Sequence, residues 1–186
     1  NRVENFEYVH AYAKAGGNDV AELSDGAGDD RLHATPTCGR LVGSTPTGSP
    51  NSPNRPFVLR AKFFDYVHAY AKNGGYDRAY LVDSAGDDVF VRNETYGKLR
   101  GDGFMNRAKF FESVRAYAFV GHDTARLFAG PGAHLSAQGN RADLWDALAA
   151  IVYDFDQVRA ISSHASNTRD VQAIDYLLSF AGPWAV

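Results

Sequence analysis

The chain is built from repeats. An eight-residue stretch that begins with Phe occurs four times, and the leading phenylalanines are 58, 47 and 44 residues apart. The copies read FEYVHAYA (6–13), FDYVHAYA (64–71), FESVRAYA (111–118) and, more weakly, FDQVRAIS (155–162). Repeats of this length are typical of arrays in which each unit packs on its neighbours and extends one core. We therefore expect any function to lie on a surface that the units share.

The repeat divides the chain into four units within a single repeat domain, 1–186. We place the units at about 1–43, 58–105, 106–150 and 151–186. Residues 44–57 are extra in the first unit and are rich in Ser, Thr, Pro, Gly and Asn, a composition that predicts a surface loop. The opening NRVENF also resembles NRAKFF at 106–111, so the chain is expected to begin at a unit boundary.

Apolar and polar residues alternate with a period of two inside the units, which predicts β-strands. In residues 77–83, Ala79 and Leu81 share one face and Tyr80 lies on the other. In residues 66–71, Val67 and Ala69 share the face that keeps small apolar residues in the other copies. We expect the faces that keep small apolar residues in every copy to point inward. The faces whose residues differ between copies should point to solvent.

The expected fold is all-β, a β-solenoid or β-roll-like stack, because alanine inside a strand requires a closely packed neighbouring layer. β-propeller-like blades are the alternative, since such blades have four strands in about 40–50 residues. Residues 141–153 show helical spacing of their apolar side chains and are predicted, with Trp184, to cap the end of the array.

Composition excludes several classes of protein. The formal net charge of −3 and the absence of a basic run in the sequence argue against nucleic acid as a partner. No apolar run reaches the ~18 residues that membrane insertion requires. Cys38 is the only cysteine, which excludes an internal disulfide and a cysteine-rich zinc site. These properties are compatible with a bacterial protein at the cell surface or outside the cell.

Two units contain an acidic glycine turn, DGAGDD at 25–30 and DSAGDD at 83–88, whereas the third unit has GPG at 130–132. Calcium prefers six to eight oxygen ligands, and a turn rich in aspartate offers several. The candidate calcium ligands are Asp25, Asp29, Asp30, Asp83, Asp87 and Asp88. The alternative is that aspartates only fix turns by accepting backbone N–H groups, which we expect above all for Asp19, Asp77 and Asp123.

Five segments fit the pattern G-x-D-x-U: GNDVA (17–21), GDDRL (28–32), GYDRA (75–79), GDDVF (86–90) and GHDTA (121–125). The chain thus resembles the calcium-binding β-rolls of RTX, or haemolysin-type, proteins. The unit as a whole also resembles the tandem repeats with a DSAGDD signature in very large bacterial surface proteins. The first resemblance implies calcium ligation by aspartates of successive coils, and the second implies a repeat module at the cell surface.

A second candidate site is aromatic and basic. If units stack in register, the outward residues of the first strands form one row, which we predict to bind a ligand: Tyr8, His10, Tyr12, Tyr66, His68, Tyr70, Arg115 and Tyr117. Such a row suits a polysaccharide or another surface protein, because tyrosine and arginine are favoured as interface anchors. The alternative is a solvent face whose aromatic rings only support cross-strand pairing.

Two functions remain open. The first is a non-enzymatic structural or adhesive module that binds carbohydrate or protein and is stabilised by calcium. The second is a polysaccharide-active, lyase-like enzyme on a β-solenoid scaffold, whose site would have to use residues that break the repeat. His122, His134, Asp143 and Asp146 are such residues. The sequence does not predict the oligomeric state.

Overall fold

The computed structural model of the protein describes residues 6–45 and 55–185. Every regular element in these ranges is a β-strand, so the prediction of an all-β chain is confirmed, and no helix there could cross a membrane. The strands are β1 (Tyr8–Tyr12), β2 (Val20–Ser24), β3 (Arg31–Thr35), β4 (Cys38–Thr45), β5 (Arg55–Lys62), β6 (Tyr66–Tyr70), β7 (Arg78–Val82), β8 (Val89–Asn93), β9 (Tyr96–Gly101), β10 (Phe104–Lys109), β11 (Ser113–Tyr117), β12 (Thr124–Ala129), β13 (His134–Gly139), β14 (Arg141–Trp145), β15 (Ala149–Tyr153), β16 (Gln157–Ser162), β17 (Thr168–Ile174) and β18 (Leu177–Ala181).

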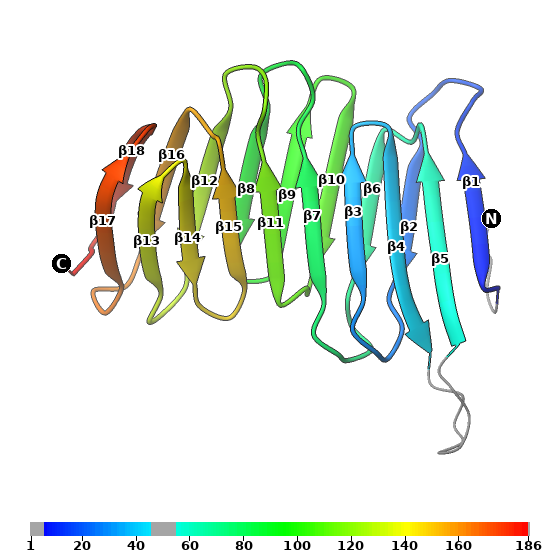
Figure 1. Cartoon of the computed structure of the whole chain (residues 1–186), viewed down its shortest axis with the longest axis horizontal. Coiled ribbons are helices and arrows are strands. Elements are labelled where there is room, and N and C mark those ends of the chain that lie inside the picture. The colour runs from blue at the N-terminus through cyan, green and yellow to red at the C-terminus, as the bar shows by residue number, and fades with distance from the viewer. Residues whose placement is uncertain (1–5, 46–54, 186) are drawn as a thin grey trace.

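The strands form two mixed sheets that lie face to face along the long axis of the molecule (Figure 1). Sheet A has ten strands in the order β1-β5-β4-β3-β7-β11-β15-β14-β13-β17. Sheet B has eight strands in the order β18-β16-β12-β8-β9-β10-β6-β2. Neighbouring strands are parallel where the chain returns from the other sheet and antiparallel within the hairpins β3-β4-β5, β8-β9-β10 and β13-β14-β15.

Each of the first three units contributes five strands and crosses between the sheets three times. In the first unit β1 lies in sheet A, β2 in sheet B, and β3, β4 and β5 return to sheet A. The chain then crosses again, so β6 opens the second unit in sheet B. Because three is odd, equivalent strands of successive units lie in opposite sheets. The fourth unit has only β16, β17 and β18, and β18 pairs with β16 at the place that β5, β10 and β15 take in the other units.

The third crossing of each unit passes through one residue in the left-handed region. These residues are Phe63, Phe110 and Asp154, with φ of 64°, 68° and 62°. Residues other than glycine rarely adopt this conformation, so its occurrence at three equivalent positions marks a built-in corner of the fold. The unit boundaries that we placed at 58, 106 and 151 fall inside β5, β10 and β15, and the corner a few residues later is where one unit passes into the next.

The core lies between the sheets and is made of the inward-facing small and apolar residues, as the alternation predicted. Val67, Ala69, Ala79 and Leu81 are all at most 3 % exposed. One hydrophobic cluster extends from Ala21 to Ala160 without a break between units. Since burial of apolar surface contributes about 25 cal/mol per Å², this continuous layer is the main source of stability.

Two expectations for single segments are wrong. Residues 141–153 form β14 and β15 in the interior of sheet A, so they are neither a helix nor a cap. Residues 149–152 of β15 are buried on both faces, and such a run can mimic helical spacing. The predicted insertion 44–57 is shorter than expected, since residues 44–45 and 55–57 extend β4 and β5, and its remainder, 46–54, lies outside the described residues. Trp184 does pack against the hydrophobic core. Its ring is edge-on to that of Phe180, and the two ring centroids are 5.7 Å apart.

Candidate functional site

The predicted row of first-strand side chains does not exist as one surface. Tyr8, His10 and Tyr12 lie on β1 at one end of sheet A, whereas Tyr66, His68 and Tyr70 lie on β6 in sheet B. Arg115 and Tyr117 lie on β11, which is in sheet A but separated from β1 by β5, β4, β3 and β7. The alternation of units between the sheets is the reason. All these side chains do face outward, so the prediction of their orientation is right and that of their neighbours is wrong.

A different row takes its place on the outer face of sheet A. His10 pairs with Arg60, Arg60 with Arg40, Arg40 with His33, His33 with Tyr80, and Tyr80 with Arg115. The pairing is in register over six neighbouring strands, β1, β5, β4, β3, β7 and β11. We call these six residues the outer row; it runs along the long axis of the molecule, across the strands.

Positive charge gathers on this face. The seven neighbouring strands from β1 to β15 contain no Asp or Glu. They include two directly opposed like-charged pairs, Arg40 with Arg60 and Arg31 with Arg78. Like charges directly opposite each other destabilise a sheet, so the arrangement costs free energy that the fold itself does not require. The near-neutral composition of the whole chain concealed this segregation.

The electrostatic effect reaches the histidines. Burial lowers the pKa of His33, and the positive charges of Arg31 and Arg40 lower it further. In sheet B, burial and Arg107 together lower the pKa of His68, against a smaller opposite effect of Glu22. Both imidazoles are therefore neutral at pH 7 and act as hydrogen-bonding groups within a cationic surrounding.

The aromatic rings of the face stack on each other. His33 and Tyr80 are parallel to within 6°, with centroids 4.7 Å apart. Tyr117 and Tyr153 are parallel to within 3°, with centroids 4.9 Å apart. These separations equal the spacing of neighbouring strands, so the rings stand on edge and present their rims to solvent. The ring faces are consequently not free to accept a sugar ring or a base, and the Arg115 guanidinium covers a further part of Tyr80 at 5.7 Å.

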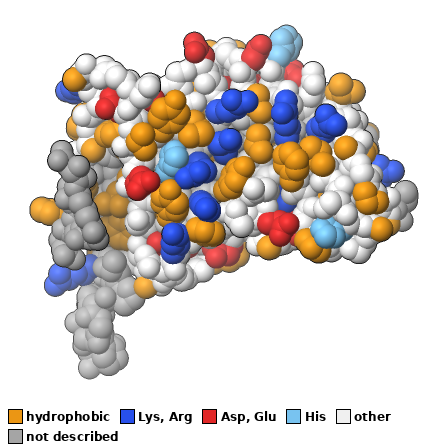
Figure 2. All heavy atoms as spheres, turned by 180° about the vertical axis from the view of Figure 1, so that it is seen from behind, with side chains coloured by type: hydrophobic (Ala, Val, Ile, Leu, Met, Phe, Trp, Pro, Cys, Tyr) orange, Lys and Arg blue, Asp and Glu red, His pale blue; other side chains and the backbone are white. Residues whose placement is uncertain are grey.

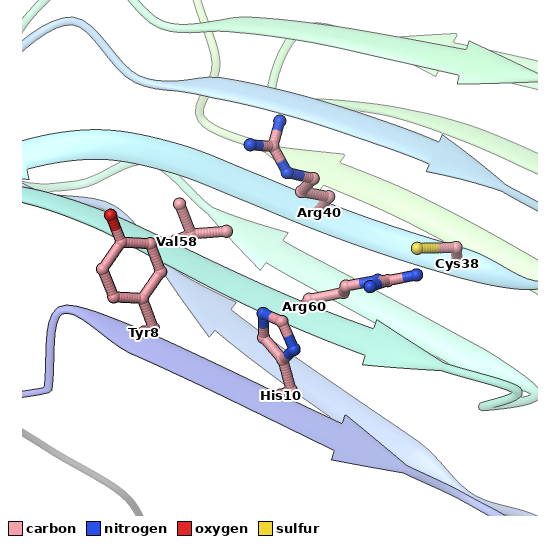
Figure 3. Close-up of a pocket in the computed structure, with 6 residues that line it drawn as sticks. All are labelled: Tyr8, His10, Cys38, Arg40, Val58 and Arg60. Carbon is pink, nitrogen blue, oxygen red and sulfur yellow. The ribbon is translucent and has the colours of Figure 1, made fainter.

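One end of the outer row lies in a shallow depression of about 430 Å³ (Figure 3). It is lined by Tyr8 and His10 of β1, Val58 and Arg60 of β5, and Cys38 and Arg40 of β4. In Figure 3 these side chains all stand on the same side of the three strands. The depression is thus open to solvent and combines two guanidinium groups with an imidazole and a phenol.

The opposite face, that of sheet B, also carries cations at its centre (Figure 2). Lys98 lies opposite Arg107, and Arg126 lies opposite Arg159. This face differs from that of sheet A in two ways. Its central row includes the acidic Glu22, next to His68. Its Arg107 is already engaged, since the guanidinium contacts His68 Nδ1 at 2.7 Å and donates to the Tyr70 hydroxyl at 3.0 Å.

The acidic turns lie at the edge where the chain crosses between sheets, and their carboxylates join one unit to the next. Asp30 N–H donates to Asp77 at 2.7 Å, and Asp77 N–H donates in turn to Glu112 at 2.7 Å. One unit later, Asp88 N–H donates to Asp123 at 2.8 Å, and Asp123 N–H donates to Asp156 at 2.7 Å. The expectation that Asp77 and Asp123 fix turns is confirmed.

Asp19 belongs to the same scheme, because its N–H donates to Asp65 at 2.7 Å. In the fourth unit the residue that corresponds to Asp77 and Asp123 is Asn167. Its Oδ1 accepts from Ala133 N–H at 2.9 Å. An amide oxygen therefore serves this structural role as well as a carboxylate does. The negative charge of the other units is not needed for the hydrogen bond.

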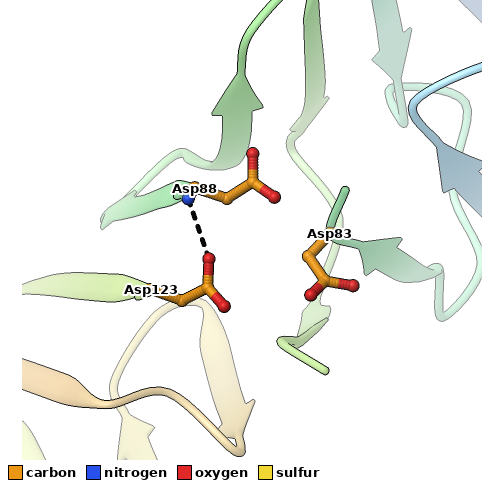
Figure 4. A group of neighbouring side chains, drawn as sticks. All are labelled: Asp83, Asp88 and Asp123. Atoms are coloured by element: carbon orange, nitrogen blue, oxygen red, sulfur yellow. Dashed lines mark hydrogen bonds between the residues drawn. The ribbon is translucent and has the colours of Figure 1, made fainter. Parts of the chain in front are cut away.

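Three carboxylates converge in the second acidic turn: those of Asp83, Asp88 and Asp123 (Figure 4). They are 7 %, 1 % and 2 % exposed, and each offers an oxygen within 4.8 Å of the others. Two oxygens bound to one calcium ion at 2.3–2.6 Å lie at most about 4.6–5.2 Å apart, so the spacing fits. Among the described residues this is the one group of three acidic, His or Cys side chains with that geometry.

The hydrogen bonds leave one oxygen of each carboxylate for such an ion. Asp83 Oδ2 accepts from Phe119 and Val120 N–H, Asp88 Oδ2 from the N–H and hydroxyl of Ser84, and Asp123 Oδ1 from Asp88 N–H. Asp88 Oδ1 is buried and has no hydrogen-bond partner. A buried carboxylate oxygen without a partner is costly, which a bound cation would offset.

The equivalent group in the preceding turn is Asp25, Asp30 and Asp77. Asp30 Oδ1 is likewise buried without a hydrogen-bond partner, and this group differs in that a side-chain amide donates to Asp25. Asp25 Oδ2 accepts from the N–H groups of Lys72 and Asn73, and its Oδ1 accepts from the Asn73 side chain at 2.9 Å. Val120 stands at the position of Asn73 in the next unit and cannot donate in this way. The remaining candidate ligands, Asp29 and Asp87, are exposed and each accept one N–H, from Tyr76 and His122 respectively.

Burial raises the pKa of several of these carboxyl groups. The pKa of Asp30, Asp77 and Asp123 is raised to about 6 in each case, first by desolvation and then by the neighbouring carboxylates. Backbone N–H donors act in the opposite direction but do not compensate. The turns therefore hold more negative charge than their surroundings stabilise at pH 7.

The residues that break the repeat are dispersed. His122 lies 3.8 Å from Asp156, His134 contacts the Thr168 hydroxyl, Asp143 pairs with Arg141, and Asp146 pairs with Arg92. In the described part of the chain these four residues do not form a shared site.

Sequence reasoning missed Arg31, Arg40, Arg60, His33 and Tyr80 as neighbours. Alternation does place each of them on an outer face, but their adjacency depends on the order of the strands, which no local motif encodes. Comparisons of this chain with protein-family models, with curated proteins and with solved structures find no match.

Proposed function

We propose that this protein is a non-enzymatic repeat module, built as a β-solenoid-like stack, that binds a polysaccharide along the outer face of sheet A. The observation that supports the proposal is the outer row: six outward residues from six neighbouring strands, all polar or aromatic and in register. A linear array of hydrogen-bonding groups suits a long polymer better than a small molecule, because the same contact is repeated along the ligand.

The manner of recognition follows from the ring geometry. Since His33 and Tyr80 stack on each other, the sugar would meet ring edges, the Tyr80 hydroxyl and guanidinium groups and would not lie on a ring face. Hydroxyl groups of a polysaccharide can pair with all of these donors and acceptors. The shallow depression gives the polymer access at the end of the row that His10, Arg60 and Arg40 form.

We further propose that the module works at the cell surface or outside the cell and that a calcium ion stabilises it at Asp83, Asp88 and Asp123. The spacing of these carboxylates and the unpartnered Asp88 Oδ1 support the second statement. Extracellular modules bind calcium with dissociation constants of about 10⁻⁴–10⁻³ M, for which an incomplete set of protein ligands is sufficient. The ion would have a structural role and would act on the relative position of two consecutive units.

The test of polysaccharide binding is a glycan array followed by co-sedimentation with insoluble polysaccharides. We expect retention of the natural chain and weaker retention of Tyr80→Ala. Tyr96→Ala on the opposite face is the matched control and should bind normally. A blank array, with no retention on any polysaccharide, would refute the proposal. Melting curves of all three proteins exclude unfolding as the reason for a loss.

A further inference from the structure

Resting on the proposed function, we infer that the polysaccharide is acidic and that its carboxylate or sulfate groups bind the arginines of the outer row. The first reason is the uncompensated charge of the face. Arg40 lies opposite Arg60, and Arg31 lies opposite Arg78. In the described part of the chain none of these four forms an ion pair with a carboxylate, because the strands around them contain none. Anionic groups of a ligand would turn repulsion into attraction.

The distribution of charge over the molecule is the second reason. The chain has 22 acidic residues against 19 basic ones, yet the acidic residues concentrate in the turns at the edges. The two faces are therefore positive although the whole chain is negative. The net negative charge of the whole chain would repel an acidic polymer. The positive charges on the face of sheet A attract it at short range.

The third reason is that guanidinium N–H donors of the outer row are not used in hydrogen bonds within the described structure. Arg40 is exposed, Arg60 is half-buried, and no hydrogen bond within the described structure uses either guanidinium. A guanidinium group offers a planar fork that matches a carboxylate or sulfate in two parallel hydrogen bonds, which is the strongest contact this face can make.

The spacing of the row also suits an extended chain of sugars. Neighbouring strands lie about 4.8 Å apart, so Arg60 and Arg40 present charges at a separation similar to that of consecutive sugar units. Arg115 lies three strands beyond Arg40, about 14 Å further along the same line. The depression around His10, Arg40 and Arg60 would hold one end of the bound segment, and Arg115 would hold the other.

Nucleic acid is also an anionic polymer, but the face fits it less well. Single-stranded nucleic acids bind largely by stacking their bases on aromatic side chains. Here His33 and Tyr80, and likewise Tyr117 and Tyr153, each cover one ring face of the other, and Tyr8 at the end of the face is the exposed ring that lines the depression. Along the rest of the row, hydrogen bonding and charge are the main contacts on offer, and they serve the hydroxyl and carboxylate groups of an acidic polysaccharide without a continuous set of stacking rings.

The experiment compares polygalacturonate and heparin as acidic probes, dextran as the neutral probe and double-stranded DNA as a second polyanion. Affinities are measured by calorimetry at low and at physiological salt. We expect binding of an acidic polysaccharide that weakens with salt, and no binding of dextran. The double variant Arg40→Gln/Arg60→Gln should bind about tenfold more weakly, because it removes two charged contacts with the polymer. The matched control, Arg126→Gln/Arg159→Gln on sheet B, should bind normally.

The possible failures are distinguishable. Binding of dextran that the arginine substitutions do not affect would leave the proposed function standing and refute the acidic ligand. No binding of any polysaccharide would refute both. Preference for DNA over both acidic polysaccharides would refute the choice of ligand, and an equal loss in the sheet B control would refute the choice of face. The melting temperature gives a second readout: Arg40→Gln/Arg60→Gln should not lower it, because the substitutions remove a repulsion.

Discussion

Arg92 and Asp146 form an ion pair inside the protein although they are 54 residues apart in the chain. Their side chains are 0 % and 3 % exposed. Arg92 points inward from β8, at a position where β3 has Ala34 and β13 has Ala137. Its guanidinium also donates to the Leu148 carbonyl at 2.6 Å, and Asp146 accepts from Gly130 N–H at 2.8 Å. The pair thus ties sheet B to the loop between β14 and β15 in sheet A.

Removal of one partner should be strongly destabilising. Asp146→Ala leaves a buried cation without its counter-charge, which costs about 3–5 kcal/mol of the free energy of unfolding. Replacement of both residues by apolar ones, Arg92→Met/Asp146→Leu, should cost clearly less, because no charge remains to be desolvated. Chemical denaturation measures both values. A loss below about 1 kcal/mol for Asp146→Ala would contradict the role of the pair.

The buried carboxyls predict a pH dependence of stability with a definite sign. The pKa of Asp123 is raised from 3.8 to about 6 in the folded chain. Between these values the folded state binds more protons than the unfolded state, so the contribution of Asp123 falls as the pH rises from about 4 to 6. Asp123→Asn removes that penalty and keeps an acceptor, as Asn167 does in the fourth unit.

We therefore expect Asp123→Asn to be more stable than the natural chain at pH 7 and equally stable near pH 4. Thermal melting in the presence of a chelator, at several pH values, measures the difference. Asp87→Asn, which removes an exposed carboxylate, is the reference substitution measured alongside Asp123→Asn. A constant difference for Asp123→Asn across the range would show that its carboxyl titrates normally.

The sequence predicts the faces of the strands but not their neighbours. Alternation is a local property, so Val67 and Ala69 could be placed inside and Tyr66 and His68 outside from eight residues alone. The order of strands is a property of the whole unit. It depends on three crossings per unit, and the third of these follows β5, β10 and β15. The first two of these strands end within the motif RAKFF, at 60–64 and 107–111, whereas β15 lacks it. Without the third crossing the count would be even, and equivalent strands of successive units would lie in the same sheet.

The same reasoning explains what could be predicted of the candidate sites. The aspartates of the second turn were found because Asp83 and Asp88 lie in one short motif. Asp123 joins them from the next unit, 35 residues after Asp88, and was expected only to fix a turn. The outer row was missed because the four repeat copies start at Phe6, Phe64, Phe111 and Phe155. They leave out the preceding RAKF at 60–63, which recurs at 107–110 and contains Arg60.

Calcium should stabilise the protein through Asp83, Asp88 and Asp123. With a dissociation constant of about 10⁻⁴–10⁻³ M, 10 mM calcium adds about 1.4–2.7 kcal/mol to the free energy of unfolding. Val120→Asn should abolish this gain, because its amide can donate to Asp83 as Asn73 donates to Asp25 in the preceding unit. Melting temperatures with calcium, with magnesium and with a chelator measure the effect. An unchanged melting temperature in calcium would exclude the site.

The close approach of the two sheets gives a prediction that does not depend on any ligand. A Cβ atom at Gly97 in β9 would lie 2.6 Å from Val114 Cγ1 in β11, on the opposite sheet. Gly39 faces Val67 in the same way, at 2.5 Å, whereas the third unit has Ala142 at this position. The backbone conformation therefore tolerates a side chain, and the close approach of Val67 and Val114 is what leaves no room for a Cβ at Gly39 and Gly97.

Gly97→Ala should accordingly destabilise the protein by about 1–3 kcal/mol, the usual cost of overpacking a core. Val114→Ala makes room for the added methyl group. The double variant should then be more stable than the sum of the two single effects predicts, by at least about 0.5 kcal/mol. Denaturant unfolding of the four proteins in this cycle measures the coupling. Strict additivity would mean that Gly97 and Val114 do not contact each other and that the sheets lie further apart at this point.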